Sequence, residues 1–177
     1  MATTTPTIRD ARPADVPALT AIQNALLDTT TYEWTEVPHT VDDRTAWLAT
    51  QRARGHPVLV AVDHDRRVIG WAAYGDFRDT GKWPGYRFTV EHTVHVAGGH
   101  WGRGIGRALV EQLVDRARAA GKRVMVAAID GSNVDSIDFH ARLDFHEVAR
   151  LPGVGEKWGR RLDLVLMQRD ITPATPA

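Results

Sequence analysis

The sequence predicts an α/β (α+β) sandwich built on a mixed sheet, and three observations lead to this fold class. Helical patterns dominate the first part of the chain, whereas strands and helices alternate over the second part. Residues 88–96 alternate apolar and polar side chains, which is the period of a strand. Residues 105–117 carry apolar side chains at helical spacing, which predicts an amphipathic helix.

The first half of the chain is expected to contain a strand, two helices and a hairpin. These elements are placed at 7–9 (strand), 15–27 and 40–55 (helices), and 58–63 and 68–77 (strands). Asp15 and Thr40 are residue types that cap a helix N-terminus, and Gly55 is typical of a helix end. Residues 78–85 contain Gly, Lys, Trp and Pro and are predicted to form a loop.

The second half is expected to continue with four strands and two helices. They are placed at 87–96 (strand), 104–120 (helix), 124–129 (strand), 133–143 (helix), and 147–150 and 162–167 (strands). Pro152 to Gly155 is predicted to be a loop. We expect residues 1–171 to form a single domain and residues 172–177 to be a disordered tail.

Composition excludes several classes of function. The 22 Lys and Arg residues balance the 22 Asp and Glu residues, so there is no long-range positive field to attract nucleic acid. The absence of cysteine excludes disulfides, thiolate metal sites and a cysteine nucleophile. The first seven residues lack the basic and apolar regions of a signal peptide, and no apolar run approaches a membrane span. We therefore expect a cytoplasmic protein with neither a nucleic-acid nor a membrane partner.

A glycine-rich turn leads from the strand at 87–96 into the next helix. Gly102, Gly104 and Gly106 occupy alternate positions immediately before the apolar stripe of that helix. Glycine lets backbone N–H groups approach a ligand, and a helix N-terminus favours phosphate oxygens. The spacing fits neither the nucleotide-triphosphate loop nor the dinucleotide fingerprint. A tight turn before an ordinary helix would give the same pattern.

The turn resembles the acyl-CoA loop of the GNAT family of N-acetyltransferases. Gly104 and Gly106 match the family pattern Arg/Gln-x-x-Gly-x-Gly/Ala, whereas Trp101 stands where Arg or Gln is usual. The order of predicted elements resembles the fold of that family over almost the full length. The resemblance implies a mixed, mostly antiparallel central sheet flanked by helices, with acetyl-CoA as cosubstrate and no metal. It places the cofactor against Val94, His95 and Val96 of the strand and against the amides of Gly102, Arg103, Gly104, Ile105, Gly106 and Arg107.

Two further segments resemble the phosphinothricin and methionine sulfoximine branch of this family. Thr89-Val-Glu91 matches the strand whose glutamate is the general base in that branch, which implies this role for Glu91. A glutamate facing solvent on a half-exposed sheet would give the same pattern. His140 stands where most of the family has a tyrosine near the cofactor sulfur, and a histidine can protonate a departing thiolate. Asn133 and Ser136 are expected to contact the pantetheine arm, although Asn133 also reads as a plain N-cap.

Candidate substrate-binding residues lie on either side of the variable loop. Arg78 follows Gly75-Asp76-Phe77 as in the branch that the chain resembles, and Arg87 follows the loop. An arginine fork suits the carboxylate of an amino-acid substrate. Lys157 belongs to a segment similar to a loop that, in this branch, reaches the partner's site in a homodimer. A polar surface loop is the alternative interpretation of that segment.

The sequence therefore predicts direct acetyl transfer from acetyl-CoA to the α-amine of a small amino-acid-like substrate, with Glu91 as base and His140 as acid. Phosphinothricin, methionine sulfoximine and methionine sulfone are the expected substrate types. Two alternatives remain open at this point. The acceptor can be a peptide N-terminus or a polyamine, or the chain can be a non-catalytic acyl-CoA sensor.

Overall fold

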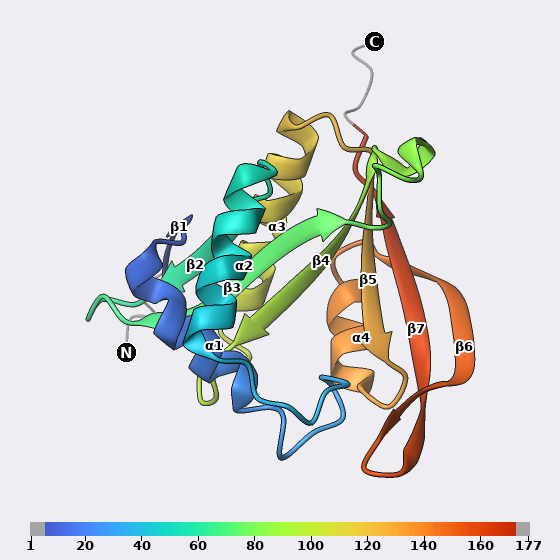
Figure 1. The fold of residues 1–177 in the computed structure, drawn as a ribbon, viewed down its shortest axis with the longest axis horizontal. Coiled ribbons are helices and arrows are strands. Elements are labelled where there is room, and N and C mark those ends of the chain that lie inside the picture. Colours follow the sequence, from blue (N-terminus) through green and yellow to red (C-terminus); the bar gives the residue numbers. More distant parts are fainter. Residues whose placement is uncertain (1–5, 173–177) are drawn as a thin grey trace. The chain divides into compact units, whose positions relative to one another are not determined.

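The computed structural model describes residues 6–172 (Figure 1). The tail expected to be disordered falls outside the described residues from position 173 onward. The chain divides into two compact units. The first unit contains residues up to Ala25, Val37–Tyr74 and Thr93–Leu113, and the second contains Leu26–Glu36, Gly75–His92 and the chain from Val114 onward.

Three antiparallel strands and two helices lie in the first unit before residue 77, and the unit also contains residues 93–113. The strands are β1 (Thr7–Asp10), β2 (Val58–Val62) and β3 (Val68–Asp76), and the helices are α1 (Val16–Asn24) and α2 (Val41–Ala53). The last two residues of β3 belong to the second unit. β2 pairs with β1 on one side and with β3 on the other, and all five of its residues are buried. The apolar core of the first unit contains Leu19, Leu48, Val60 and Trp71. The hairpin and both helices predicted for this part of the chain are therefore confirmed.

The start of α1 differs from the prediction. Asp15 was expected to cap the helix, but its own backbone is helical and it ends a short 3₁₀ turn, Pro13–Asp15. Its carboxylate accepts hydrogen bonds from the backbone N–H of Arg12 (2.6 Å) and from the guanidinium of Arg9. The acidic side chain thus stabilises the turn before the helix. Thr40 does cap α2, because its hydroxyl accepts from the N–H of Asp43 at 3.0 Å.

The second unit contains the first half of β4 (Thr89–Val96), together with β5 (Val124–Asp130), β6 (His146–Lys157), β7 (Arg160–Asp170) and α4 (Val134–Ala141). β5 pairs in parallel with β4 and antiparallel with β7, and β7 pairs antiparallel with β6. The strand order is β1-β2-β3-β4-β5-β7-β6. These pairings confirm the expected mixed, mostly antiparallel sheet.

β6 is much longer than the predicted strand at 147–150. Residues Pro152 to Gly155, predicted to be a loop, are part of the strand, and the pairing register shifts between Leu151 and Gly155. A proline is tolerated here because β6 is the last strand in the order, and one of its sides has no partner strand among residues 6–172. The segment 78–88 also contains a short 3₁₀ helix, Pro84–Tyr86, which local composition did not predict.

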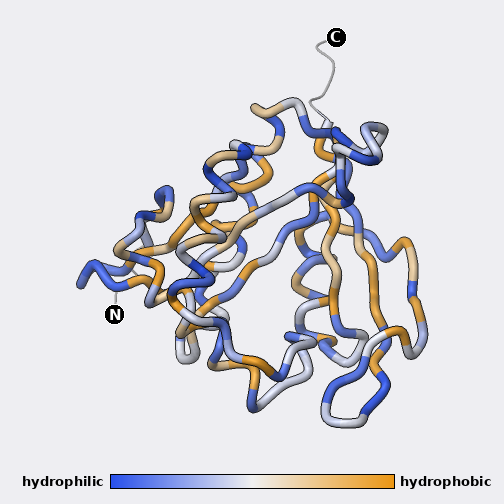
Figure 2. Tube along the Cα trace, viewed as in Figure 1, coloured by the Kyte–Doolittle hydropathy of each residue, from blue (hydrophilic) through white to orange (hydrophobic). Residues whose placement is uncertain are grey.

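The Cα trace coloured by hydropathy passes through many apolar residues along the strands of each unit (Figure 2). In the second unit, Met125, Leu143, Phe145 and Val165 are almost completely buried. No helix among residues 6–172 has the length and apolarity that a membrane span needs.

Candidate functional site

The glycine-rich turn lies in the first unit, between the end of β4 and the start of α3 (Ile105–Ala119). Gly102 and Gly104 have φ values of +73° and +77°, a conformation that favours glycine. A Cβ added at either position would meet no atom within 4 Å. The first helical N–H groups have no acceptor within a helix, and the N-terminal end of its dipole is positive. The turn therefore offers open space and N–H donors, which fits the diphosphate of a coenzyme A.

Trp101 stabilises the turn from within. Its indole N–H donates to the carbonyl oxygen of Val96 at 2.7 Å, although the side chain is 64% exposed. The residue that departs from the family pattern therefore closes the loop onto the end of β4. Arg103 and Arg107 are exposed on the same turn, and both are cationic groups suited to phosphate.

The second half of β4 also lies in the first unit. Val94 and Val96 are half-buried, whereas the His95 side chain is buried beside Trp71, with 4.7 Å between ring centroids. Nε2 of His95 lies 3.0 Å from the hydroxyl of Thr93. Burial, together with the positive charge of Arg44, lowers the pKa of His95 to about 3. The imidazole is thus a neutral packing group, and the backbone of this strand is the part suited to a cofactor.

Glu91 and Arg78 lie in the second unit and interact electrostatically. Glu91 is half-buried on β4, and burial raises the pKa of its carboxyl group. The positive charge of Arg78 opposes that shift. The guanidinium of Arg78 lies 5.3 Å from the ring centroid of Phe77, which in turn packs against Tyr86. The structure therefore brings together a carboxylate suited to accept a proton and a cation suited to bind an anionic substrate.

Arg87 is held at the base of the same loop. Its guanidinium donates to the carbonyl oxygen of Pro84 at 3.1 Å and lies 4.3 Å from the ring centroid of Phe88. Its own carbonyl oxygen accepts a hydrogen bond from the ammonium of Lys122 at 2.8 Å. These contacts fix the end of the loop and account for the position of Arg87 without a ligand.

Helix α4 carries three of the predicted site residues. The side chain of Asn133 caps it by accepting from the N–H of Ser136 at 3.1 Å. Nδ1 of His140 lies 2.7 Å from the carbonyl oxygen of Ser136, which can only accept, so Nδ1 carries the proton. Burial lowers the pKa of His140, so the ring is neutral near pH 7 and its Nε2 holds a lone pair. This tautomer changes the expectation for His140, because a neutral Nε2 has no proton to give until it has received one.

Asp144 lies in the turn that follows α4. Its φ is +61°, which is the left-handed conformation that aspartate tolerates better than most residues. The turn after α4 therefore keeps the shape that a glycine would give it. Phe145, the next residue, is buried and packs against His140.

The sequence analysis missed His92. This residue follows Glu91 in β4, so its side chain points to the opposite face of the strand. Its ring lies 5.1 Å from that of His140, and among residues 6–172 neither of its ring nitrogens has a hydrogen-bond partner. The same strand alternation that identified Glu91 was the available signal, because it places His92 on the inner face.

Lys157 is buried in the second unit rather than exposed on a loop. Its ammonium donates to the carbonyl oxygens of Leu27 (2.8 Å), Thr30 (2.9 Å) and Glu33 (2.8 Å). Only 1% of the residue is exposed. All three donors of the ammonium have partners, so the structure gives this residue a contact with the segment 26–36 in place of the expected substrate contact. One of these acceptors, the carbonyl oxygen of Leu27, lies just beyond the end of α1. The helix ends at Asn24, whereas the sequence predicted an end near residue 27.

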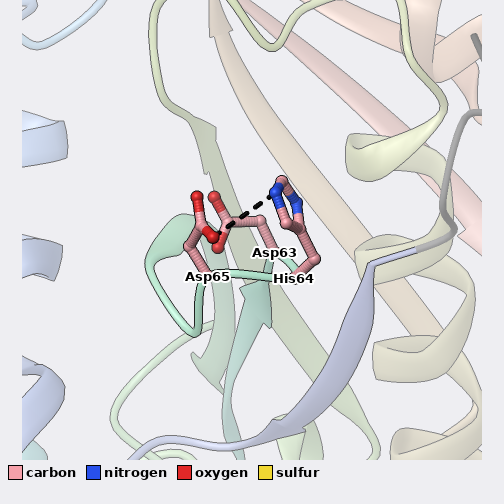
Figure 3. A group of neighbouring side chains, drawn as sticks. All are labelled: Asp63, His64 and Asp65. Carbon is pink, nitrogen blue, oxygen red and sulfur yellow. Dashed lines mark ion pairs between the residues drawn. The ribbon is translucent and has the colours of Figure 1, made fainter.

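One group of possible metal ligands occurs in the described part of the chain. Asp63, His64 and Asp65 lie together at the turn between β2 and β3 (Figure 3). The carboxylate of Asp63 accepts from the N–H of Arg67 at 2.8 Å, and His64 lies 3.4 Å from Asp65. His64 and Asp65 are exposed, and the hydrogen bonds of the hairpin turn account for this arrangement.

Comparison with known proteins places the chain among acetyltransferases. The model of the acetyltransferase (GNAT) family matches residues 19–145. The chain is 45% identical over 170 residues to an L-methionine sulfoximine/L-methionine sulfone acetyltransferase of Pseudomonas aeruginosa, covering 96% of this chain and 97% of that protein. It is 36% identical to a phosphinothricin N-acetyltransferase of Alcaligenes faecalis over 93% of this chain and 82% of the relative.

A solved structure agrees with these relatives. A GNAT superfamily phosphinothricin acetyltransferase from Sinorhizobium meliloti, in complex with acetyl-CoA, superimposes with a TM-score of 0.89 at 34% identity. The match covers 98% of this chain and 93% of that one. The family match and the relatives identify an acetyl-CoA-dependent N-acetyltransferase. The chain belongs to the GNAT family of acetyltransferases.

Proposed function

We propose that this enzyme acetylates the α-amine of a small amino acid with a polar, tetrahedral side-chain head, of the methionine sulfoximine, methionine sulfone or phosphinothricin type. The names of the relatives support this substrate class. The observation that carries the proposal is the half-buried carboxylate of Glu91, which interacts electrostatically with the cation Arg78. A carboxylate with a raised pKa suits proton abstraction, and an arginine suits the carboxylate of an amino acid.

The glycine-rich turn is proposed to hold the cosubstrate. The amides of residues 102–107 bind the diphosphate, and the positive charges of Arg103 and Arg107 add to this attraction. Acetyl-CoA supplies an acetyl group already activated as a thioester. The backbone N–H of Val94 is proposed to stabilise the negative charge that develops on the acetyl oxygen. Asn133 and Ser136 at the start of α4 are proposed to contact the pantetheine arm.

Glu91 is proposed to remove the first proton. The α-amine is mostly ammonium at neutral pH and must lose a proton before its nitrogen can attack. Because burial raises the pKa of Glu91, its carboxylate is a stronger base than an exposed glutamate. Arg78 keeps the carboxylate ionised and is proposed to bind the carboxylate of the same substrate.

His140 is proposed to move the second proton. As the C–N bond forms, a second proton leaves the amine nitrogen, and the departing sulfur requires one. Nε2 of His140 carries a lone pair, since Nδ1 donates to the carbonyl oxygen of Ser136. Nε2 therefore first accepts the proton and then donates it to the sulfur. This order replaces the simple acid role that the sequence predicted.

The decisive experiment compares Glu91→Gln with the parent enzyme. Both are incubated with acetyl-CoA and a panel of amino acids, peptides and polyamines, and free CoA thiol is measured. We expect thiol release with the sulfoximine, sulfone or phosphinothricin and a fall in kcat of about 10²–10⁴-fold for Glu91→Gln. Glu147→Gln, which alters an exposed glutamate paired with Arg150, is the matched control. Parent-like turnover by Glu91→Gln contradicts the assigned base, and coenzyme binding without thiol release for any acceptor identifies a sensor.

We also propose that the enzyme forms a homodimer through β6. This strand ends the strand order, and it exposes Val148 (56%), Leu151 (40%) and Val154 (57%). An exposed apolar edge strand favours association with another chain. Light scattering is expected to give the mass of a dimer for the parent and a lower mass for Val154→Lys. Val37→Lys, which changes an exposed valine of the first unit, serves as control, and a monomeric parent contradicts the proposal.

A further inference from the structure

Three buried ring nitrogens without hydrogen-bond partners gather in the second unit. They are Nδ1 and Nε2 of His92 and Nε2 of His140, and among residues 6–172 none of them has a partner. The two rings lie 5.1 Å apart, tilted by 46°. A buried polar atom without a partner destabilises the folded state, so such atoms are rare in native proteins. Three of them on two adjacent rings require an explanation.

Phenylalanine rings contact the pair, and the hydroxyl of Ser136 lies 3.4 Å from Nδ1 of His140. The ring of His92 lies 5.3 Å from Phe145, and the ring of His140 meets Phe139 and Phe145 edge-on. α4 contributes the carbonyl oxygen of Ser136, which binds Nδ1 of His140. β5, which also packs against α4, carries Asp130, but that carboxylate accepts from Ser132 and Trp34. The titratable group in ring contact with His140 is therefore His92.

Packing alone does not require an imidazole at position 92. A phenylalanine has a similar shape, would keep the contact with Phe145, and would bury no polar atom. Replacing a buried, unpaired polar group by an apolar one of the same shape is neutral or stabilising. An imidazole kept here at the expense of stability, beside a proposed catalytic residue, indicates a role in the chemistry.

We propose that His92 is a positioning residue that acts through His140, by making it easier for Nε2 of His140 to carry a proton during turnover. The inference rests on the proposed function, in which that proton passes from the amine nitrogen to His140 and then to the sulfur. A neutral imidazole offers a dipole and a lone pair to the nearby imidazolium, whereas a phenyl ring offers neither. His92 itself stays neutral, because two buried imidazolium groups at this distance repel one another.

The pKa directions agree with this arrangement. Burial, together with the charge of a protonated His140, lowers the pKa of His92 to about 3. The pKa of His140 is also lowered by burial, while the hydrogen bond to Ser136 opposes the shift. The pair therefore carries at most one proton near neutral pH, and Nε2 of His140 is the atom that receives it.

The test compares His92→Phe with His92→Gln. Three quantities are measured: kcat and KM for the amino-acid acceptor, the melting temperature, and the titration of His140 by nitrogen NMR of the free protein. For His92→Phe we expect kcat to fall by about tenfold or more, KM to change by less than about twofold, and the His140 titration to move to lower pH. The melting temperature should stay equal or rise. His92→Gln, which keeps a donor and an acceptor, should recover part of the kcat.

His56→Phe is the matched control, because it removes another buried histidine, one that packs beside Tyr74 in the first unit. A lower melting temperature for His92→Phe, with unchanged kcat and unchanged His140 titration, overturns the proposal and makes His92 a packing residue. If His92→Phe does not fold, His92→Leu, which also removes both ring nitrogens, is measured in its place, and unchanged kcat with an unchanged His140 titration in that variant overturns the proposal. A parent enzyme that acetylates none of the amino acids refutes the proposed function instead, and the NMR titration still decides whether the two rings are coupled.

Discussion

The ammonium of Lys157 lies 2.8 Å from the carbonyl oxygen of Leu27, although 130 positions separate the two residues in the chain. Thr30 and Glu33 provide the other two carbonyl oxygens. One buried side chain thus satisfies three backbone acceptors of the segment 26–36, which forms neither a helix nor a strand. A backbone carbonyl that is buried without a partner is costly, so this cation takes the place of the hydrogen bonds that regular structure would have provided.

Lys157→Met tests how much these three hydrogen bonds contribute to stability. Methionine keeps most of the volume but leaves the three carbonyl oxygens without their donor, so we expect the free energy of unfolding to fall by about 2–4 kcal/mol. Urea unfolding followed by circular dichroism measures the change. Arg160→Met removes an exposed cation from the neighbouring strand β7 and should change stability by less than about 0.5 kcal/mol. Equal urea midpoints for Lys157→Met and the parent would show that the hydrogen bonds of Lys157 contribute nothing to stability.

Acid should destabilise this protein well above the pH at which its carboxylates titrate. Burial lowers the pKa values of His92 and His95 from the ordinary 6.5 to about 3. Between those values the unfolded chain binds a proton at each histidine and the folded chain does not, so stability is complete above pH 6.5 and declines as pH falls towards 3. From pH 7 to pH 5 each histidine is expected to remove about 2 kcal/mol from the free energy of unfolding.

Urea titrations at pH 7, 6 and 5 give that slope directly. His92→Phe should remove the contribution of His92, about 2 kcal/mol between pH 7 and pH 5, and leave the contributions of His95 and His140, whose pKa values burial also lowers. A parent protein whose stability does not change over this range would mean that the two imidazoles titrate normally in the folded state.

Arg78→Met should shift the pH profile of the reaction. The positive charge of Arg78 opposes the raised pKa of Glu91, so its loss lets that pKa rise further. Since the proposed mechanism needs ionised Glu91, the acidic limb of kcat/KM moves to higher pH. Loss of a charge-assisted contact with the substrate carboxylate should also raise KM by about tenfold or more. Lys82→Met, which removes another cation from the same loop, is the charge-matched control. An identical acidic limb in Arg78→Met and the parent would show that Arg78 does not influence the pKa of Glu91 during the reaction.

Much of the fold follows from local patterns in the sequence. Strand alternation located β4 and placed Glu91 on a half-buried face. The residue types that cap helices identified Thr40 and Asn133, because a cap depends on side chains within three residues. The hydrogen bond from His140 to the carbonyl oxygen of Ser136 spans a single helical turn, so the spacing already contained the information that fixes its tautomer.

Features that depend on distant partners were not predictable in this way. The environment of Lys157 is set by carbonyls more than 120 positions earlier, and no local pattern distinguishes it from an exposed lysine. The length of β6 is set by its ladder with β7, which overrides the turn preference of Pro152 and Gly153. The contact between His92 and His140 joins two elements about 50 positions apart. Only the folded chain therefore reveals that, among residues 6–172, both ring nitrogens of His92 and Nε2 of His140 lack hydrogen-bond partners.

The last prediction concerns the glycine-rich turn and uses two glycines with the same backbone conformation. Gly104 (φ +77°) lies at the start of α3, and Gly121 (φ +72°) lies beyond its end; a Cβ at either position would meet no atom within 4 Å. Alanine at each should therefore destabilise the fold similarly, by about 1–2 kcal/mol, because both require the left-handed conformation. If the amides of the turn bind the coenzyme diphosphate, only Gly104→Ala places a methyl group where the phosphates approach. Calorimetry should then give a Kd for coenzyme A that is at least about tenfold higher for Gly104→Ala and unchanged for Gly121→Ala. Equal Kd values for the two variants would show that the turn does not bind the coenzyme.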